Sequence, residues 1–249
     1  MKRSIFFLII CLVTILSVMA CTITLPTSSG LTTRGSGKVT TETRNVSGFE
    51  RVALSGTGDL TITQGDSEGL EIEAEDNLIT LIESEVRGGT LYIGFKNNTG
   101  GISPTKPIIY RLKVKQLSGI EASGAGSIKV DSLATDDLKL ESSGAGNITI
   151  GSLTAKQITL HVSGAGNCEL AGKADGLVVD LSGAGAIRAG DLETQTVKIT
   201  ISGAGKAVVW ATVSLDAELS GAGNVEYYGK PSVNVKSSGT GQTKSLGDK

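Results

Sequence analysis

Hydrophobic and polar residues alternate along most of the chain in short runs of four or five positions. In "NITI" (147–150) the second and fourth residues, Ile148 and Ile150, are apolar and the other two are polar. In "ITLHV" (158–162) the first, third and fifth residues are apolar. A period of two places successive side chains on opposite faces of a β-strand. The runs therefore predict short strands with one buried and one exposed face.

The two kinds of run recur with the motif S-G-A/T-G between them. After a first gap of 68 residues, the motif repeats every 18 to 20 residues. Each unit contains the motif, a four-residue strand, a loop that absorbs the length variation, and a five-residue strand. Such a period is typical of a solenoid, in which each coil buries its inner face against the next. The eight copies begin at Ser55, Ser123, Ser143, Ser163, Ser182, Ser202, Ser220 and Ser238.

We predict an all-β fold: a single-stranded right-handed parallel β-helix (β-solenoid) of about 20-residue coils, with an irregular insertion near the N-terminal end. The hand follows from the rule for parallel crossovers. An antiparallel meander or sandwich shares the alternation but does not need identical corners. In the solenoid the motif is a corner whose small residues let coils stack closely. The structural corner glycines are Gly56, Gly58, Gly124, Gly126, Gly144, Gly146, Gly164, Gly166, Gly183, Gly185, Gly203, Gly205, Gly221 and Gly223.

The insertion is expected at 75–119, between a first unit at 55–74 and the regular repeats of 120–241. The first unit fits the template, with Leu60 and Ile62 followed by Leu70, Ile72 and Ala74 as a second strand. Because solenoids need covered ends, the insertion is expected to cap the first coil. A ligand surface is the alternative. The insertion's aromatic residues are Tyr92, Phe95 and Tyr110.

Four stretches of the insertion predict local structure. "DNLITLIESEV" (76–86) predicts a short helix, and "NNTGGISPTK" (97–106) predicts a loop. "GGTLYIGFK" (88–96) and "PIIYRLKVK" (107–115) predict strands. At the other end of the array, Thr243 and Ser245 occupy core-type positions, which predicts that the repeats stop there.

The first twenty residues have the pattern of an export signal. Two basic residues precede a long apolar run, and a small residue comes before the break. "VMAC" (18–21) resembles a bacterial lipobox, in which the cysteine becomes the lipidated first residue of the mature chain. An ordinary signal peptide or an anchor helix containing a cysteine is the alternative. We assign 1–20 as a lipoprotein signal peptide and expect lipid attachment at Cys21.

Residues 21–43 are rich in Thr, Ser and Gly and are expected to be a flexible tether. Residues 44–249 are expected to form the β-helical domain. The expected location is the cell envelope, with the lipid in the outer membrane or the outer face of the plasma membrane. Of the other cysteines, Cys11 leaves with the signal and Cys168 has no partner for a disulfide.

Charge and motif context argue against several functions. The chain has 23 basic and 25 acidic residues and no basic stretch, so no nucleic-acid partner is expected. S-G-A-G is not a phosphate loop, because a strand follows it instead of a helix N-terminus. Repeated calcium binding is disfavoured because Ala186 and Lys206 occupy the position after two corners. We therefore expect no cofactor, no metal site and no catalytic residue.

Individual side chains are consistent with these exclusions. Glu71, Glu73 and Glu75 share one strand face and are expected to be solvated, not a catalytic cluster. His161 points outward without a second histidine, and Cys168 replaces an inward isoleucine. Trp210, Tyr227 and Tyr228 either cover the end of the core or offer a stacking surface for sugar or peptide.

Three stretches together carry a family resemblance: "VSGFERVALSGTGDLTITQGD", "EIEAEDNLITLIESEVRGGTLYIGF" and the serial "SGAGNI"-type repeats. Over about residues 44 to 241 the chain resembles the GIN-domain family of "putative auto-transporter adhesin" heads. The resemblance implies an exported or lipidated bacterial protein with a β-helical fold and supplies no catalytic residues.

The expected function is non-enzymatic: adhesion, or a structural or interaction role in the envelope. The partners would be the membrane, through the lipid, and a glycan or protein surface ligand. Two alternatives stay open. One is a polysaccharide-active β-helix enzyme. The other is an envelope sensor or stress-response partner that uses the 75–119 segment.

Overall fold

The computed structural model describes residues 32–97 and 99–249, which form one compact unit. The expected signal peptide, the expected lipidation site at Cys21 and the first part of the expected tether lie outside the described residues.

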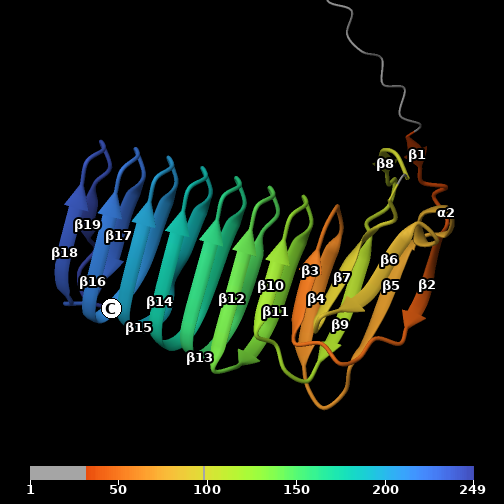
Figure 1. The fold of residues 1–249 in the computed structure, drawn as a ribbon, viewed down its shortest axis with the longest axis horizontal. Coiled ribbons are helices and arrows are strands. Elements are labelled where there is room, and N and C mark those ends of the chain that lie inside the picture. Colours follow the sequence, from red (N-terminus) through yellow and green to blue (C-terminus); the bar gives the residue numbers. More distant parts are fainter. Residues whose placement is uncertain (1–31, 98) are drawn as a thin grey trace, which may run out of the picture. The chain divides into compact units, whose positions relative to one another are not determined.

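The described chain is a stack of coils whose strands form two facing parallel sheets (Figure 1). We call the strands that lead into a corner the entry sheet and those that follow a corner the exit sheet. Entry strands are β3 (Arg51–Leu54), β10 (Gly119–Ala122), β12 (Asp137–Ser142) and β18 (Ser232–Ser237). Exit strands are β4 (Asp59–Gln64), β11 (Ser127–Ala134), β17 (Asn224–Tyr228) and β19 (Thr243–Ser245). Four longer strands contribute to both sheets: β13 (Ile148–Val162), β14 (Asn167–Leu181), β15 (Ala186–Ile201) and β16 (Lys206–Leu219).

Equivalent residues of successive coils stack in register. The exit sheet aligns Ile128, Ile148, Cys168, Ile187, Ala207 and Val225 in one row, and each is at most 1% exposed. The entry sheet aligns Leu140, Leu160, Val179, Ile199 and Ala217 in the same way. All of these residues except Ala217 belong to one continuous core. The all-β prediction of parallel coils of about 20 residues is confirmed.

The corners form a hydrogen-bonded ladder of closely stacked backbone. The N–H of Ala145 donates to the carbonyl of Gly124 one coil earlier, at 3.0 Å, and the same bond recurs at later corners. A Cβ on Gly144 would lie 1.9 Å from that carbonyl oxygen. Among the assigned corner glycines, only Gly56 and Gly58 have left-handed φ angles, 100° and 125°. Most corners therefore need glycine for close approach, not for an unusual backbone angle.

The 75–119 segment contains less helix than the sequence predicted. Helix α2 spans only Asp76–Ile79, and β6 (Ile82–Arg87) pairs antiparallel with β7 (Thr90–Phe95). The expectation of a helix through residue 86 was wrong. Gly88 and Gly89, with φ angles of 56° and 73°, make a two-residue hairpin turn. Because this turn joins two antiparallel strands, residues 82–87 form a strand and not a helix. The loop expected at 97–106 contains the short strand β8 (Ile102–Ser103), whereas the strand expected at 107–115 is present as β9 (Ile109–Val114).

The first unit departs from the template in its second half. Strand β5 (Gly69–Glu75) pairs antiparallel with β9 in the exit sheet and does not join the entry sheet. The entry-sheet position beside β3 is taken by β7, which runs parallel to it. Because β7 and β9 extend both sheets beyond the first coil, the 75–119 segment forms a cap at this end.

The flexible tether expected up to residue 43 is also corrected. Strand β2 (Val39–Arg44) pairs antiparallel with β5, and β1 (Thr33–Arg34) pairs with β8. The stretch "VTTETR" contains β-branched residues, which suit strands, and β5 offers it a free edge. At the opposite end β19 still pairs with β17, so the strand ladder continues through Thr243 and Ser245.

Candidate functional site

The acidic residues of β5 are held in contacts within the cap. Arg111 donates hydrogen bonds to Glu71 at 2.8 Å and to Glu73 at 3.0 Å. The bonds to Glu73 and Glu71 raise the pKa of the Arg111 guanidinium. A guanidinium fork bridging two carboxylates stabilises their charged forms, which suits a strand–strand clamp between β5 and β9.

Glu75, expected on the solvated face, is instead fully buried. Its carboxylate accepts hydrogen bonds from the N–H groups of Gly37 at 2.6 Å and Thr105 at 2.8 Å, and from the Thr105 hydroxyl at 2.5 Å. Burial acts to raise its pKa, but the bonds from Thr105, Gly37 and Lys106 outweigh it and lower the pKa to about 2. A Cβ on Gly35 would lie 1.8 Å from this carboxylate. Glu75 therefore ties the segment around Gly37 to the loop around Thr105.

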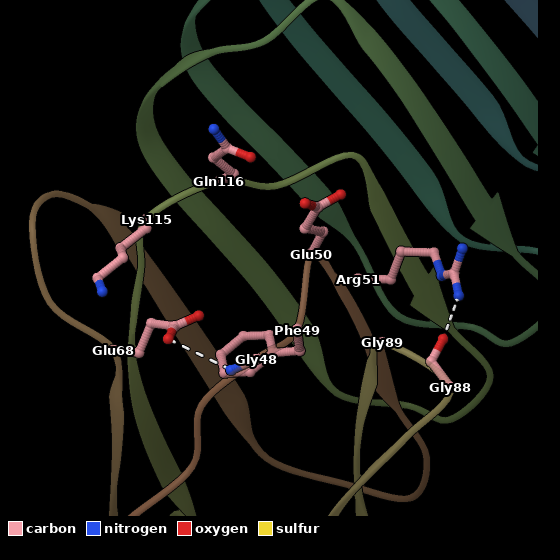
Figure 2. Close-up of a pocket in the computed structure, with 9 residues that line it drawn as sticks. All are labelled: Gly48, Phe49, Glu50, Arg51, Glu68, Gly88, Gly89, Lys115 and Gln116. Carbon is pink, nitrogen blue, oxygen red and sulfur yellow. Dashed lines mark hydrogen bonds between the residues drawn. The ribbon is translucent and has the colours of Figure 1, made fainter.

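A shallow polar hollow lies where loops of the cap and the first coil meet (Figure 2). Its volume is about 580 Å³. Two hydrogen bonds shape it: Gly48 N–H to Glu68 at 3.3 Å, and Arg51 to the Gly88 carbonyl at 2.6 Å. The lining residues are Gly48, Phe49, Glu50, Arg51, Glu68, Gly88, Gly89, Lys115 and Gln116. The mixed charges suit a polar ligand or a protein loop.

The cap's aromatic residues are mostly turned inward. Tyr110 is fully buried beneath Gly58, where a Cβ would meet its ring at 2.6 Å, and Phe95 packs against the core. Tyr92 is 40% exposed and carries the guanidinium of Arg87 at 4.7 Å from its ring centroid. Of the three aromatic residues of the insertion, Tyr92 is exposed, Phe95 is half-buried and Tyr110 is buried, so the alternative of a ligand surface has one exposed aromatic side chain.

The aromatic residues of the last coils are engaged by the chain itself. Trp210 and Tyr228 are neighbours in register on the outer face of the exit sheet, and Tyr227 packs against the core. The ammonium of Lys249 lies 5.7 Å from the Trp210 ring centroid and 5.0 Å from that of Tyr228. It also donates to the Gly190 carbonyl at 2.7 Å and contacts Asp191. A sugar stacking here would have to displace this lysine, so the arrangement favours the covering role over the stacking role.

The remaining candidate groups do not converge. His161 is on the outer face of the entry sheet, with its Nδ1 3.9 Å from an oxygen of Asp180. Cys168 is fully buried, and burial raises the pKa of its thiol to about 12, which suits an inert core residue. Within the described residues, no three His, Cys, Asp or Glu side chains are grouped to hold a metal. No helix in that part of the chain is long and apolar enough to cross a membrane.

Comparison with solved structures agrees with this architecture. A "putative adhesin" from Bacteroides fragilis NCTC 9343 superposes with a TM-score of 0.82 at 29% identity, over 86% of this chain and 100% of that one. A "putative adhesin" from Parabacteroides merdae ATCC 43184 has a TM-score of 0.67 at 23% identity, over 86% and 99% of the chains. A "putative lipid binding protein" from Parabacteroides distasonis ATCC 8503 has a TM-score of 0.74 at 22% identity, over 86% and 99%. The last two show likeness of fold alone.

The family comparison covers most of the chain. The family model "Putative auto-transporter adhesin, head GIN domain" matches residues 48–231. No curated protein matches the chain. The family and the structural neighbours support an adhesion-type surface protein. The chain belongs to the GIN-domain family of adhesin heads.

Proposed function

We propose that the protein is an exported lipoprotein, anchored through Cys21, whose solenoid acts as a non-enzymatic adhesion head. The lipobox-like "VMAC" supports the anchor. Adhesion needs an anchored end and a contacting end, and the described chain has two different ends. The chain enters at the cap, next to β1, and the coils then stack away from it (Figure 1).

The observation that carries the proposal is this asymmetry. Both sheets are extended beyond the first coil by the parallel strands β7 and β9, and the exit sheet is extended further by the antiparallel strand β5. From β4 the exit sheet continues through seven further strands to β19, which at about 4.8 Å per strand is a distance of about 34 Å. The last coil therefore lies at the end of the stack opposite the cap, and it is where contact with another surface is expected.

Two experiments test the two parts of this proposal. Cys21→Ser should move the protein from the membrane fraction to the soluble fraction, and persistent lipid labelling would refute the anchor. For adhesion, beads carry the Cys21→Ser protein through either an N-terminal or a C-terminal tag. The probes are cells that bear the protein, cells that lack it and a glycan array. Beads loaded through the N-terminus expose the last coil and should adhere, whereas equal adhesion in both orientations would refute a contact at that end.

Partner capture at the hollow of Figure 2 is the second candidate, because three loops bring Glu68, Lys115 and Glu50 together there. Deleting 75–119 would not test it, since β7 and β9 are strand partners of β3 and β4. Lys115→Glu changes the charge of the hollow without touching those strands. It should abolish capture of an envelope partner if the hollow is the contact. Unchanged capture would rule the hollow out.

A further inference from the structure

The last coil leaves the edges of both sheets open. Among the described residues, β18 pairs with β16 and β19 pairs with β17, and neither has a strand on its other side. Val233 and Val235 are in register with the buried residues Leu215 and Ala217, so they point toward the core. They are nevertheless 39% and 41% exposed. The core therefore reaches the surface at β18.

The exit-sheet edge at the opposite end of the stack is protected in a way that β18 is not. There the edge of the exit sheet is β2, where Thr40 and Glu42 lie opposite the core residues Ala74 and Ile72. Polar and charged side chains at inward edge positions discourage strand addition. At β18 the inward positions are both valine. Thr243, the inward residue of β19 beside Val225, also has a hydroxyl with no hydrogen-bond partner among the described residues.

We propose that β18 docks on β18 of a second copy of this chain, antiparallel about a twofold axis centred on Asn234. Strand pairing requires inward residues to face inward residues, which excludes registers centred between two residues. Centring on Asn234 places Val233 opposite Val235 of the second copy, and Val235 opposite Val233 of the second copy. Centring on Val235 would instead place Val233 opposite Ser237. The first register buries all four valines against one another and is favoured by apolar burial.

The charges at this edge are compatible with the same register. On the outer face, Asn234 donates to Asp216 of β16 at 3.0 Å, and Lys236 lies beside Glu218. The twofold places Lys236 opposite Ser232 of the second copy and Asn234 opposite its own equivalent. No like charges meet across the new strand pair, and each Lys236 keeps the neighbouring carboxylate of Glu218. Because β18 is complementary to the same strand of a second copy, the contact is isologous and closes as a dimer.

The dimer would give the adhesion head its partner, an inference that rests on the proposed function. The twofold runs across the stack, so the capped ends point in opposite directions, and the first coils of the two copies lie about 70 Å apart at about 4.8 Å per strand. Two molecules on facing membranes would therefore bridge them. The contact is one strand pair wide, so each bond is expected to be weak, and many bonds in parallel would supply the adhesion.

Sedimentation equilibrium of the Cys21→Ser chain tests the contact. We expect a reversible monomer–dimer equilibrium that is independent of metal and glycan. Val235→Lys places a charge at the centre of the contact in both copies and should lower the association constant at least about tenfold. Val39→Lys is the matched control, because Val39 is 42% exposed but lies at the capped end. A chain that stays monomeric at about 1 mM, within the range of effective concentrations for tethered modules, would overturn the proposal. Equal loss in both variants would overturn it too, because that outcome indicates a head-to-tail contact.

Cross-linking tests the register. Asn234→Cys should give a disulfide-linked dimer under mild oxidation, since opposite residues of an antiparallel pair have Cβ atoms about 4.5–5.5 Å apart. Lys236→Cys, on the same exposed face, would be about 14 Å from its equivalent and should not cross-link. Equal cross-linking of the two would indicate non-specific contact and would refute the register. The bead assay separates this inference from the proposed function. If the beads adhere to cells that lack the protein while the chain stays monomeric in solution, the adhesion function is retained. The second copy is then rejected as the partner.

Discussion

Gly144→Ala tests why the corner motif recurs. The alanine Cβ would start 1.9 Å from the carbonyl oxygen of Gly124 and 2.8 Å from its carbon. The φ angle of Gly144 lies outside the left-handed region, so backbone strain does not contribute. Any loss of stability therefore measures the close stacking of one corner on the previous one.

The magnitude follows from the movement that the methyl group requires. Carbon and oxygen atoms that are not bonded stay at least about 3 Å apart, so the two corners must separate by about 1.1 Å. The bonds from the N–H groups of Ala145 and Gly146 to Gly124 are 3.0 Å and 3.3 Å long and would both be lost. Two backbone bonds contribute about 1–3 kcal/mol, and overpacking adds about 1–3 kcal/mol. Together they give an expected loss of about 2–6 kcal/mol.

The measurement is urea unfolding followed by circular dichroism, with Gly65→Ala as the matched control. A Cβ at Gly65 meets nothing within 4 Å, and its φ is ordinary. Alanine there should be neutral or stabilising by about 0.4–1 kcal/mol, because it restricts the unfolded chain. Solenoids can unfold in stages, so both the midpoint and the slope are compared. Equal stability of the two variants would refute the close-packing explanation of the motif.

Three further predictions concern the core, the cap and the last coils. Ile148→Asp should lower the free energy of unfolding in urea by about 4 kcal/mol or more, because it buries a charge. Thr149→Asp, one position along on the outer face, should change it by no more than about 0.5 kcal/mol. Similar losses in the two variants would contradict the assignment of the inner and outer faces of this strand. The folded pKa of Glu75, about 2, is below its ordinary value of 4.5, so the stability that Glu75 contributes is present above pH 4.5 and is lost as the pH falls toward 2. Glu75→Gln should flatten the pH dependence of the unfolding free energy in that window. An unchanged acid-unfolding profile would contradict the role of Glu75. Lys249→Ala should change the fluorescence of Trp210, the only tryptophan in the sequence, and lower the stability of the last coils by about 0.5–1 kcal/mol. Identical fluorescence spectra would mean that the lysine does not cover the ring.

The regular coils could be predicted from the sequence because two independent periods agree there. The period of two identifies which face of each strand is buried, and the period of about 20 residues shows that successive strands stack in parallel. Ile148 is an example: its inward position follows from its neighbours, and its stacking on Ile128 follows from the repeat. The covering role of Trp210 remained one of two alternatives, because the partner that decides it, Lys249, is 39 residues away in the sequence.

The cap could not be predicted in the same detail because each of its strand pairings occurs once and is not repeated along the chain. Leu70, Ile72 and Ala74 alternate as an inward strand should, but alternation does not distinguish an antiparallel edge in one sheet from a parallel strand in the other. Glu75 continues the alternation of Glu71 and Glu73, yet it is buried because segments 30 and 38 residues away fold over it. Its signal was present only as Gly35 and Gly37, small residues that permit the approach.

The two ends of the array show what a repeat pattern can reveal about its own limits. A cap interrupts the period, so the 68-residue gap after Ser55 marks the sealed end in the sequence itself. At the other end "VNVKS" still fits the template, with Val233 and Val235 at inward positions that the next coil would normally cover. Thr243 and Ser245 make the last exit strand polar, but they leave the last entry strand unchanged. Strand β18 matches the template, and no further strand covers it in the described chain. Its inner face has the apolar pattern of the earlier coils, so the surface that best complements it is another strand of the same kind.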